Sequence, residues 1–505
     1  MIRMISHIIM LFIMLSIGFS SNQYEFSFSD RECLTNEILS IKNGSIEPSN
    51  FIFPYISESD SDFYNIIKNN RYSSLYPVLG IRYSNSSFEL FPKYINSDLL
   101  WITPGLEFNY NRSFSLPFMA SPLFQIQNYF RFNKHSAFGF DGVEVNKEEN
   151  SLMFPYNPNY SNELYYLSRE PKNGIDFDEG EGALALMTPY ADLIFGKFRS
   201  RVGPFMSGNL SISNQAPGFP QIQIRTKSEN MQFTFIIGEL YSGLFENLNY
   251  SDHENVQFPK KVRRYIINHR LDIKIKDNFR IGFYEQVIAG HNLPLLYMVP
   301  TMPFWSAQHS LGDTDNLQMG FDLEYIINNN RFYGGFIMDE WSPFDTFNSN
   351  HHNWFGGQLG FSRLFIDKVL LKLEYTRIEP QVYTHDDIIN FPFHYNYPIG
   401  YWSGGDSEDV FVKIFCNINN STDFALNIRH TIMGTPIYSY DSTGFLDSGN
   451  LKKRFLFGFN FNKVVKSKYG AINYNLKIEN IESENIYDND KIINCQLSIL
   501  YNINY

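Results

Sequence analysis

Apolar and polar side chains alternate along much of this chain, most clearly near its C-terminus. From residue 493 to residue 505 every odd position is apolar or aromatic, with Cys495 counted as apolar, and every even position except Leu500 is polar. A period of two places the two kinds of side chain on opposite faces of a β-strand. The segment is long enough for a tilted strand to cross a hydrocarbon core of about 30 Å. An edge strand of a soluble sandwich would show the same alternation, so one strand does not decide between them.

Repetition of the pattern decides in favour of a membrane barrel. Amphipathic helices are almost absent from the same region, and a sheet in lipid must close because an open edge leaves backbone groups unpaired. Residues 76–505, roughly 430 in number at about 24 to 27 per strand and loop, predict 16 or 18 antiparallel strands, because bacterial barrels have even numbers. The alternation recurs at residues 233–237, 279–283, 319–325, 369–375, 410–418, 455–461 and 472–478.

The parity of each segment predicts which side chains face lipid. A charge facing lipid at the membrane centre costs about 2 to 4 kcal/mol, whereas the lumen tolerates it. Leu371→Arg is therefore expected to be costly and Lys372→Leu much milder. Glu285 is an exception, because it falls on the apolar parity after Phe283, and we expect a β-bulge or the water boundary to explain it. The alternation places Phe321, Leu323, Leu371 and Leu373 toward lipid, and Arg280, Asp322, Lys372 and Glu374 toward the lumen.

Three stretches lack sustained alternation. Residues 21–75 contain turn signals such as Asn43-Gly44 and a short helical pattern at 60–68, so we expect a small periplasmic or plug element ahead of the barrel. Residues 141–182 are acidic and rich in Tyr and Asn, and residues 379–408 form a second long interruption. Long connections lie on the outer surface of such barrels, so both are expected to be outer loops.

The N-terminus carries the features of a signal peptide. Arg3 precedes an apolar run over residues 8–19, which is too short for a transmembrane helix, and Gly18 and Ser20 are small residues suited to cleavage. An N-terminal membrane anchor is the alternative, but the chain becomes polar immediately after Ser20. We therefore expect three parts: a signal peptide at 1–20, the plug element at 21–75 and the barrel at 76–505.

Composition supports an outer-membrane location and argues against nucleic-acid binding and a disulfide framework. Aromatic residues make up 17% of the chain, mean hydropathy is −0.27, and no long apolar run follows the signal segment, which excludes a helical membrane protein. The net charge of −12 argues against nucleic acid as a partner. Three cysteines give no disulfide framework, and Cys416 and Cys495 fall on the lipid-facing parity of their strands.

Signals for catalysis are weak. His351-His352 lacks further residues at metal-ligand spacing, and Asp386-Asp387 would point to opposite sides of a strand. The sequence contains neither a glycine-rich phosphate loop nor a nucleophile motif. We therefore expect no enzyme, no cofactor and no metal site.

Two stretches carry more pattern than a generic barrel requires. The first runs from Gly196 to Pro204 and continues in Leu-Ser-Ile-Ser-Asn-Gln-Ala-Pro at 210–217, and the second begins with His269-Arg270-Leu271 and continues through Glu285 and Val287. Together with Asp315-Asn316 and Asp339-Glu340 they resemble the capsule-assembly Wzi family of outer-membrane proteins. Phe195 stands where the family often has Trp, and Phe205 where Gly is commoner. The resemblance covers roughly residues 30–345, including the lead-in at 43–54.

This resemblance implies a closed barrel with a helical N-terminal plug that acts as a surface lectin for capsular or exopolysaccharide. We expect the family-like residues to cluster as a network that shapes and seals the lumen. Simpler interpretations are arginines paired with lumen carboxylates, turn residues at 315–316, and a strand end at 339–340. Direct sugar contact would fall to aromatic residues of the outer loops at 156–166 and 393–402. The set comprises Arg199, Arg201, Arg270, Glu285, Asp315, Asn316, Asp339 and Glu340.

A second function stays open at this stage. A barrel of 16 to 18 strands is wide enough to conduct unless it is plugged, so a porin or substrate-specific channel is the alternative. The expected partners are a surface polysaccharide, outer-membrane lipid and the barrel-assembly machinery, and the expected state is a monomer. Conductance in a planar bilayer would separate the two functions.

Overall fold

The fold is taken from a computed structural model. It describes residues 24–27, 30–47, 52–53, 55–58, 71–85, 98–115, 123–138, 174–188, 190–226, 228–246, 260–312, 314–339, 354–394, 397–419, 421–435, 445–447, 449, 451–467, 470–484 and 489–504. The expected signal peptide at 1–20, the expected helix at 60–68, His351-His352 and Tyr505 lie outside the described residues. No helix within the described ranges is both long and apolar enough to cross a membrane.

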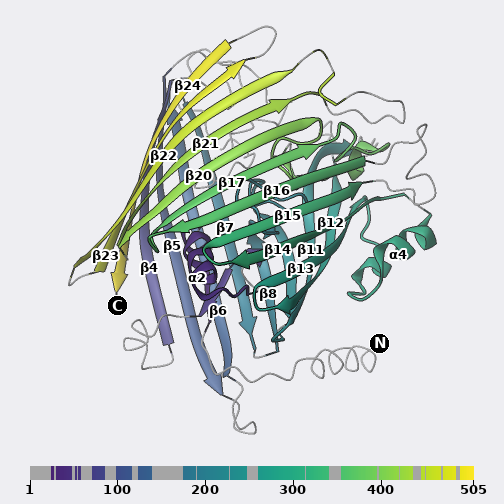
Figure 1. The fold of residues 1–505 in the computed structure, drawn as a ribbon, viewed down its shortest axis with the longest axis horizontal. Coiled ribbons are helices and arrows are strands. Elements are labelled where there is room, and N and C mark those ends of the chain that lie inside the picture. Colours follow the sequence, from purple (N-terminus) through teal and green to yellow (C-terminus); the bar gives the residue numbers. More distant parts are fainter. Residues whose placement is uncertain are drawn as a thin grey trace, which may run out of the picture.

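Eighteen strands within the described ranges pair antiparallel with their neighbours and close into a barrel (Figure 1). The last strand closes the barrel by pairing with the first, for example Leu497 with Ile81. The larger of the two expected strand numbers is therefore confirmed. The strands are β4 (Arg71–Ser84), β5 (Leu99–Ser115), β6 (Leu123–Phe138), β7 (Gly174–Met187), β8 (Ala191–Phe198), β10 (Phe219–Thr226), β11 (Met231–Glu246), β12 (Lys260–Lys276), β13 (Phe279–Gly290), β14 (Asn316–Ile327), β15 (Asn330–Asp339), β16 (Trp354–Phe365), β17 (Val369–Ile378), β20 (Ser407–Asn419), β21 (Thr422–Met433), β22 (Lys452–Ser467), β23 (Gly470–Glu484) and β24 (Asn489–Asn504).

The alternation assigns the two faces of the wall correctly. Phe321, Leu323 and Leu373 point outward and are exposed, and a barrel whose outer face is apolar suits a lipid surrounding. Arg280, Asp322, Lys372 and Glu374 all point inward and are buried. Cys416 and Cys495 also take outward parity, next to the exposed Ile418 and Leu497, and both are free thiols.

Short and long connections segregate to opposite ends of the barrel. β12 and β13 are joined by Asp277 and Asn278 alone, and β14 and β15 by Asn328 and Asn329, at the end where β24 finishes. Residues 291–315 and 379–406 connect strands at the other end, which we call the mouth. Long loops of such barrels face the cell exterior, so the mouth is the outer end.

One expected loop is shorter than the alternation indicated. β7 begins at Gly174, so residues 174–182 belong to a strand, and residues 141–173 lie outside the described part. Gly180, Gly182 and Ala183 carry little or no side chain, and this hides the alternation that marks the other strands. The second expected loop is found at 379–406, and it contains η5 (Ile388–Asn390), β18 (Phe393–His394) and β19 (Tyr397–Pro398).

A helix inside the barrel forms the N-terminal plug. We call α2 (Asp30–Asn43) the plug helix; it lies within the ring of strands in Figure 1. Leu34, Ile38 and Ile41 share one helical face and are buried, and Gly44, at φ +63°, ends the helix. This helix precedes the one expected from sequence, and β4 begins slightly before residue 76. Its apolar face packs against the inward side chains Ile326, Leu364, Leu370, Phe415 and Ala425.

Two short sheets accompany the plug helix. β1 (Tyr24–Ser27) pairs with β3 (Tyr55–Glu58), and β2 (Ile52–Phe53) pairs with β9 (Arg201–Val202). The second pairing joins the N-terminal segment to the stretch that follows β8.

A second helical segment lies on the outside of the barrel. Residues 291–315, which we call the outer flap, contain η3 (Leu295–Met298) and α4 (Phe304–Leu311). The side chains of Tyr297, Phe304 and Ala307 pack against outward residues of β11 to β14. Figure 1 accordingly draws α4 beside the wall rather than within it.

Candidate functional site

The first family-like stretch folds into the barrel. After β8 ends at Phe198, residues 199–218 turn inward before β10 begins; we call them the lumen loop. Asn209 organises it, because its amide Oδ1 accepts from the Phe205 backbone N–H at 3.0 Å and its Nδ2 donates to the Phe205 carbonyl at 3.1 Å. Gly203 has φ +129°, and an added Cβ would lie 2.3 Å from Asn209 Oδ1, so this position requires glycine.

The lumen loop bonds to both the wall and the mouth. Asn268 Nδ2 donates to Ser211 Oγ at 3.0 Å, and the Ser211 hydroxyl donates to Gln286 Oε1 at 3.1 Å. The Tyr383 hydroxyl donates to the Leu210 carbonyl at 2.6 Å, and the Ser213 N–H donates to the Ile399 carbonyl at 2.7 Å. The first family-like stretch therefore forms a buried segment in the lumen that is bonded to both the wall and the mouth.

Buried ion pairs line the inner wall across β12 to β14. Arg270 Nη1 donates to Asp322 Oδ2 at 2.6 Å and its Nε donates to Asp272 Oδ2 at 2.8 Å. Arg280 bonds Asp272 and donates to Asp322 Oδ1 at 2.5 Å. Because each charge has partners of opposite sign, the set is stable only as a unit.

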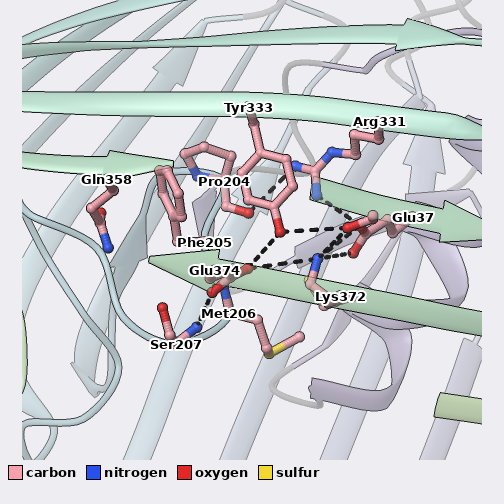
Figure 2. A network of polar contacts seen from close by, with 12 residues as sticks. Glu37, Pro204, Phe205, Met206, Ser207, Arg331, Tyr333, Gln358, Lys372 and Glu374 are labelled. Atoms are coloured by element: carbon pink, nitrogen blue, oxygen red, sulfur yellow. Dashed lines mark hydrogen bonds and ion pairs between the residues drawn. The ribbon is translucent and has the colours of Figure 1, made fainter. Parts of the chain in front are cut away.

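The wall network continues to the plug helix through Arg331 (Figure 2). Arg331 Nε lies 2.6 Å from Glu324 Oε1, and its Nη1 lies 2.8 Å from Glu37 Oε1. Lys372 Nζ donates to both oxygens of Glu37, at 2.7 and 2.6 Å. A single carboxylate of the plug helix therefore neutralises cations from two wall strands.

Glu374 connects the same wall region to the lumen loop (Figure 2). The Ser207 N–H donates to Glu374 Oε2 at 2.6 Å and the Met206 N–H to Oε1 at 3.0 Å. The Tyr333 hydroxyl also donates to Glu374 Oε1, at 2.6 Å, and its ring lies 5.0 Å from that of Phe205. The plug helix, the lumen loop and the wall thus meet in one polar network.

The mouth is covered by residues 379–406, which we call the mouth loop. Arg264 of β12 donates to three backbone carbonyls of this loop, including those of Ile388 at 2.8 Å and Phe393 at 2.7 Å. Tyr383, Ile399 and Tyr401 are buried. Of the described aromatic residues at 393–402, Tyr401 is buried, whereas Phe393, Tyr397 and Trp402 are half-buried.

A half-buried patch remains at the mouth beside this loop. The guanidinium carbon of Arg429 lies 4.8 Å from the centre of the Trp402 ring, and that of Arg454 lies 5.2 Å from it. Arg377 lies 3.8 Å from the ring centre of Phe445 and its side chain is half exposed. Arg377 faces outward from β17 whereas Arg454 faces inward from β22, so these two pairs are separate, and we call Trp402 and Arg454 the mouth patch.

The expected site residues on the inner side fall into separate groups. Arg199 lies 3.4 Å from Glu181, and Arg201 donates to Cys33 Sγ of the plug helix at 2.7 Å. Arg270 belongs to the wall network described above. Their contacts are with protein groups, as the interpretation of paired lumen charges indicated.

Two of the other expected residues hold the mouth loop. Asn316 Nδ2 donates to the Thr384 carbonyl at 3.2 Å, and Asp339 Oδ2 accepts from the Tyr383 N–H at 2.7 Å. Asp339 ends β15 but is buried, so the expectation of a strand end reaching solvent does not describe it. Glu340 lies outside the described residues.

The last two expected residues belong to the region of the outer flap: Glu285 lies under it, and Asp315 is its last residue. Glu285 points out of the barrel while Arg270 on the neighbouring strand points in, so the expected single cluster is not formed. Its carboxylate Oε2 lies 2.9 Å from His269 Nε2 and accepts from the Phe304 N–H at 2.6 Å. Asp315 Oδ2 accepts from the Tyr297 hydroxyl at 2.6 Å. Neither a bulge nor water explains Glu285, because the flap supplies its partners.

Sequence reasoning missed the residues that connect these parts. Glu37 and Tyr333 carried no motif, although the spacing of Leu34, Ile38 and Ile41 and the following Gly44 are signals for a helix. Within the described ranges no group of three or more His, Cys, Asp or Glu could hold a metal ion. What the geometry offers is therefore a lumen crossed by ion-paired and hydrogen-bonded protein segments, beneath a half-buried aromatic ring with guanidinium groups beside it.

Two titratable groups make this interior sensitive to acid. Burial would raise the pKa of Glu37, but the charges of Lys372 and Arg331 outweigh it and hold the pKa at about 2. Burial, with the nearby charge of Lys197, lowers the pKa of His394 in the mouth loop to about 3. Its neutral ring accepts from the Tyr241 N–H through Nδ1 at 2.9 Å.

Stability should therefore fall in two stages as pH is lowered. In the unfolded chain, His394 becomes protonated below about pH 6.5 and Glu37 below about pH 4.5. In the folded protein the same two side chains stay unprotonated down to about pH 3 and about pH 2, respectively. The midpoint of thermal unfolding in detergent should drop between pH 6.5 and 4.5 in the wild type. His394→Gln, which can still accept the Tyr241 bond, should remove that upper stage. An unchanged slope in this variant would contradict the assignment.

Comparisons with known proteins give a family and a fold. The family model of capsule assembly protein Wzi matches residues 137–490. Wzi of Escherichia coli, described as an outer membrane protein involved in group 1 capsule assembly and as a carbohydrate-binding β-barrel, superposes with a TM-score of 0.56 at 11% identity, over 94% of this chain and 98% of that chain. OccAB4 of Acinetobacter baumannii gives 0.46 at 11% identity over 86% and 98%, and OccK7 of Pseudomonas aeruginosa 0.45 at 10% over 86% and 99%. No curated protein sequence matches.

Proposed function

Because this chain belongs to the family of capsule assembly protein Wzi, we propose that it binds a capsular or exopolysaccharide at the outer face of the outer membrane and retains it on the cell. The E. coli family member is described as a carbohydrate-binding barrel. The family's role is assembly of a capsule, which agrees with a binding protein rather than an enzyme.

The observation that carries this proposal is a lumen occupied by the plug helix and the lumen loop, beneath a mouth that the mouth loop covers in part. The plug helix, the lumen loop and the mouth loop are joined to the wall by buried ion pairs and hydrogen bonds. A polymer cannot thread such a barrel without breaking them, so binding at the mouth is the simpler use of the structure.

The mouth patch supplies suitable chemistry for a sugar polymer. Aromatic rings cover the apolar faces of sugars, and guanidinium groups bind carboxylates with two parallel hydrogen bonds. Trp402 provides a ring, and Arg454 provides charge beside it. We assign direct sugar contact to this patch, and a supporting role to the buried residues Arg199, Arg201, Arg270, Asn316 and Asp339. Residues 156–166, the other loop expected to contact sugar, lie outside the described part.

The alternative of a porin or a substrate-specific channel needs an open path. Such a path would be lined by Lys372, Arg280 and Arg331, yet each of these side chains forms an ion pair with a buried carboxylate. We therefore expect the wild-type protein to give no steady conductance in a planar bilayer.

Capsule retention tests the proposal. Cells lacking the protein should still make the polymer but release it into the medium, measured as cell-bound and soluble polysaccharide. Trp402→Ala and Arg454→Gln should weaken binding of purified polymer by about tenfold or more, which corresponds to about 1.4 kcal/mol each. Ile388→Ala, an exposed apolar side chain in the same loop, is the matched control. Normal retention together with loss of uptake of a small solute would support the channel instead.

A further inference from the structure

The outer wall at β11 to β14 differs from the rest of the lipid-facing surface. Phe283 and Phe321 point outward and are 49% and 38% exposed. Ile267, Val287 and Leu317 point outward too, nearer the mouth, but are only 0%, 0% and 7% exposed. Tyr297, Phe304 and Ala307 of the outer flap cover them. The flap thus folds down over the outside of the wall instead of over the mouth.

Polar contacts hold the flap in this position. The N–H of Phe304, at the start of α4, donates to Glu285, and the Phe304 ring stacks on His269 with ring centres 4.1 Å apart. His269 Nδ1 also lies 3.3 Å from the Pro300 carbonyl oxygen. An outward carboxylate without such partners would be costly against lipid. The flap therefore supplies the partners that the outward Glu285–His269 pair needs, and the pair in turn holds the flap against the wall.

Several large apolar side chains of the flap are exposed, with polar ones such as Ser306 and His309 among them. Leu295 is 78% exposed and Trp305 48%, and Met298, Val299 and Leu311 are also exposed. Residues 291–315 contain neither Lys nor Arg, so the flap lacks the permanent cations that would favour a lipid phosphate or an acidic sugar. On the same strands, farther from the mouth, the exposed Phe283 and Phe321 continue this apolar surface into the lipid-facing wall.

We propose that the outer flap is embedded in the membrane and binds the acyl chains of the outer leaflet through Leu295, Met298 and Trp305. An apolar surface of this kind, fixed on the outside of a barrel, is stabilised by hydrocarbon and not by water. Trp305 lies on a short helix near the mouth, and tryptophan prefers the boundary between headgroups and acyl chains. The flap then fixes how deeply the mouth sits relative to the membrane surface.

Fluorescence of Trp305 tests this placement. The full-length protein would be reconstituted into phosphatidylcholine vesicles whose acyl chains carry bromine near the carbonyl end, with unbrominated vesicles for comparison. The emission that Trp305→Phe lacks should be quenched by the brominated chains and should resist aqueous iodide. Quenching by iodide without quenching by bromine would overturn the proposal. Retained heat-dependent mobility of Trp305→Phe on gels would show that this variant still forms the barrel.

A second copy of the chain is the competing occupant of the flap. In lipid nanodiscs the wild type and Leu295→Asp should both be monomeric, since the proposal assigns the surface to lipid. A wild-type dimer that Leu295→Asp dissociates, with no bromine quenching of Trp305, would overturn the proposal. Ile388→Asp, at another exposed apolar position, in the mouth loop, is the matched control.

Discussion

Replacing Lys372 with leucine should lower the free energy of unfolding by about 3 to 5 kcal/mol, the usual result of removing one partner from a buried ion pair. The change leaves Glu37 buried with Arg331 as its remaining cation and takes a charge from beside Glu374. Urea unfolding in detergent measures the loss. It should equal or exceed that of Leu371→Arg, a charge placed on the lipid side at about 2 to 4 kcal/mol.

The double variant Glu37→Leu/Lys372→Leu distinguishes the loss of the ion pair from the effect of placing leucine at residue 372. Because both charges disappear together, its loss should be well below the sum of the two single losses. Lys372→Leu should also loosen the plug helix, so that conductance steps appear in a planar bilayer where the wild type shows none. A cost of less than about 1 kcal/mol for Lys372→Leu would mean that the pair is no more important than an exposed one.

Deleting residues 497–505 should abolish the protein from the membrane. These residues pair β24 with β23 on one side and with β4 on the other, for example Ile503 with Gly470 and with Leu75. Without them the sheet has two open edges, whose unpaired backbone groups lipid cannot satisfy. Immunoblots of membrane and periplasmic fractions should show degradation in the periplasm. The deletion removes Tyr505 as well, which the sequence identifies as the terminal aromatic of this strand.

A point variant provides the control for this deletion. Gln496→Ala changes a polar side chain on the inward face of the same strand and leaves every backbone pair in place, so membrane levels should stay normal. Normal membrane levels of the truncated protein would refute the closure of the barrel by β24.

The barrel was predictable because its signal is local. Each strand repeats every two residues, and the side facing lipid must be apolar wherever it occurs, so Phe321 and Leu373 could be assigned without any partner being known. The same reasoning failed at Gly182, which faces outward, and at Ala183, which faces inward, because such small residues carry no signal. A helical N-terminal plug was expected, but the helix lies at Asp30–Asn43, where the spacing of Leu34, Ile38 and Ile41 was the signal for it.

The site was less predictable because its chemistry depends on partners distant in sequence. Parity placed Lys372 in the lumen correctly but implied that its loss would be mild, since a lumen charge was assumed to be in water. The structure places Glu37 against it, and this reverses the expectation. The outward position of Glu285 could not be explained from the sequence for a related reason, because only the fold brings Phe304 and His269 to this carboxylate.

The plug helix also constrains the order in which the protein can assemble. It is made before any barrel strand, yet its Glu37 binds Lys372, 335 residues later in the chain, and Arg331, 294 residues later. Contacts this distant in sequence form late, because the chain between them must first be ordered. Until β15 and β17 are in place the helix has neither its cations nor the inward surface that covers Leu34 and Ile38. The plug helix must therefore wait for wall strands that are made hundreds of residues later before its charge and its apolar face find their partners.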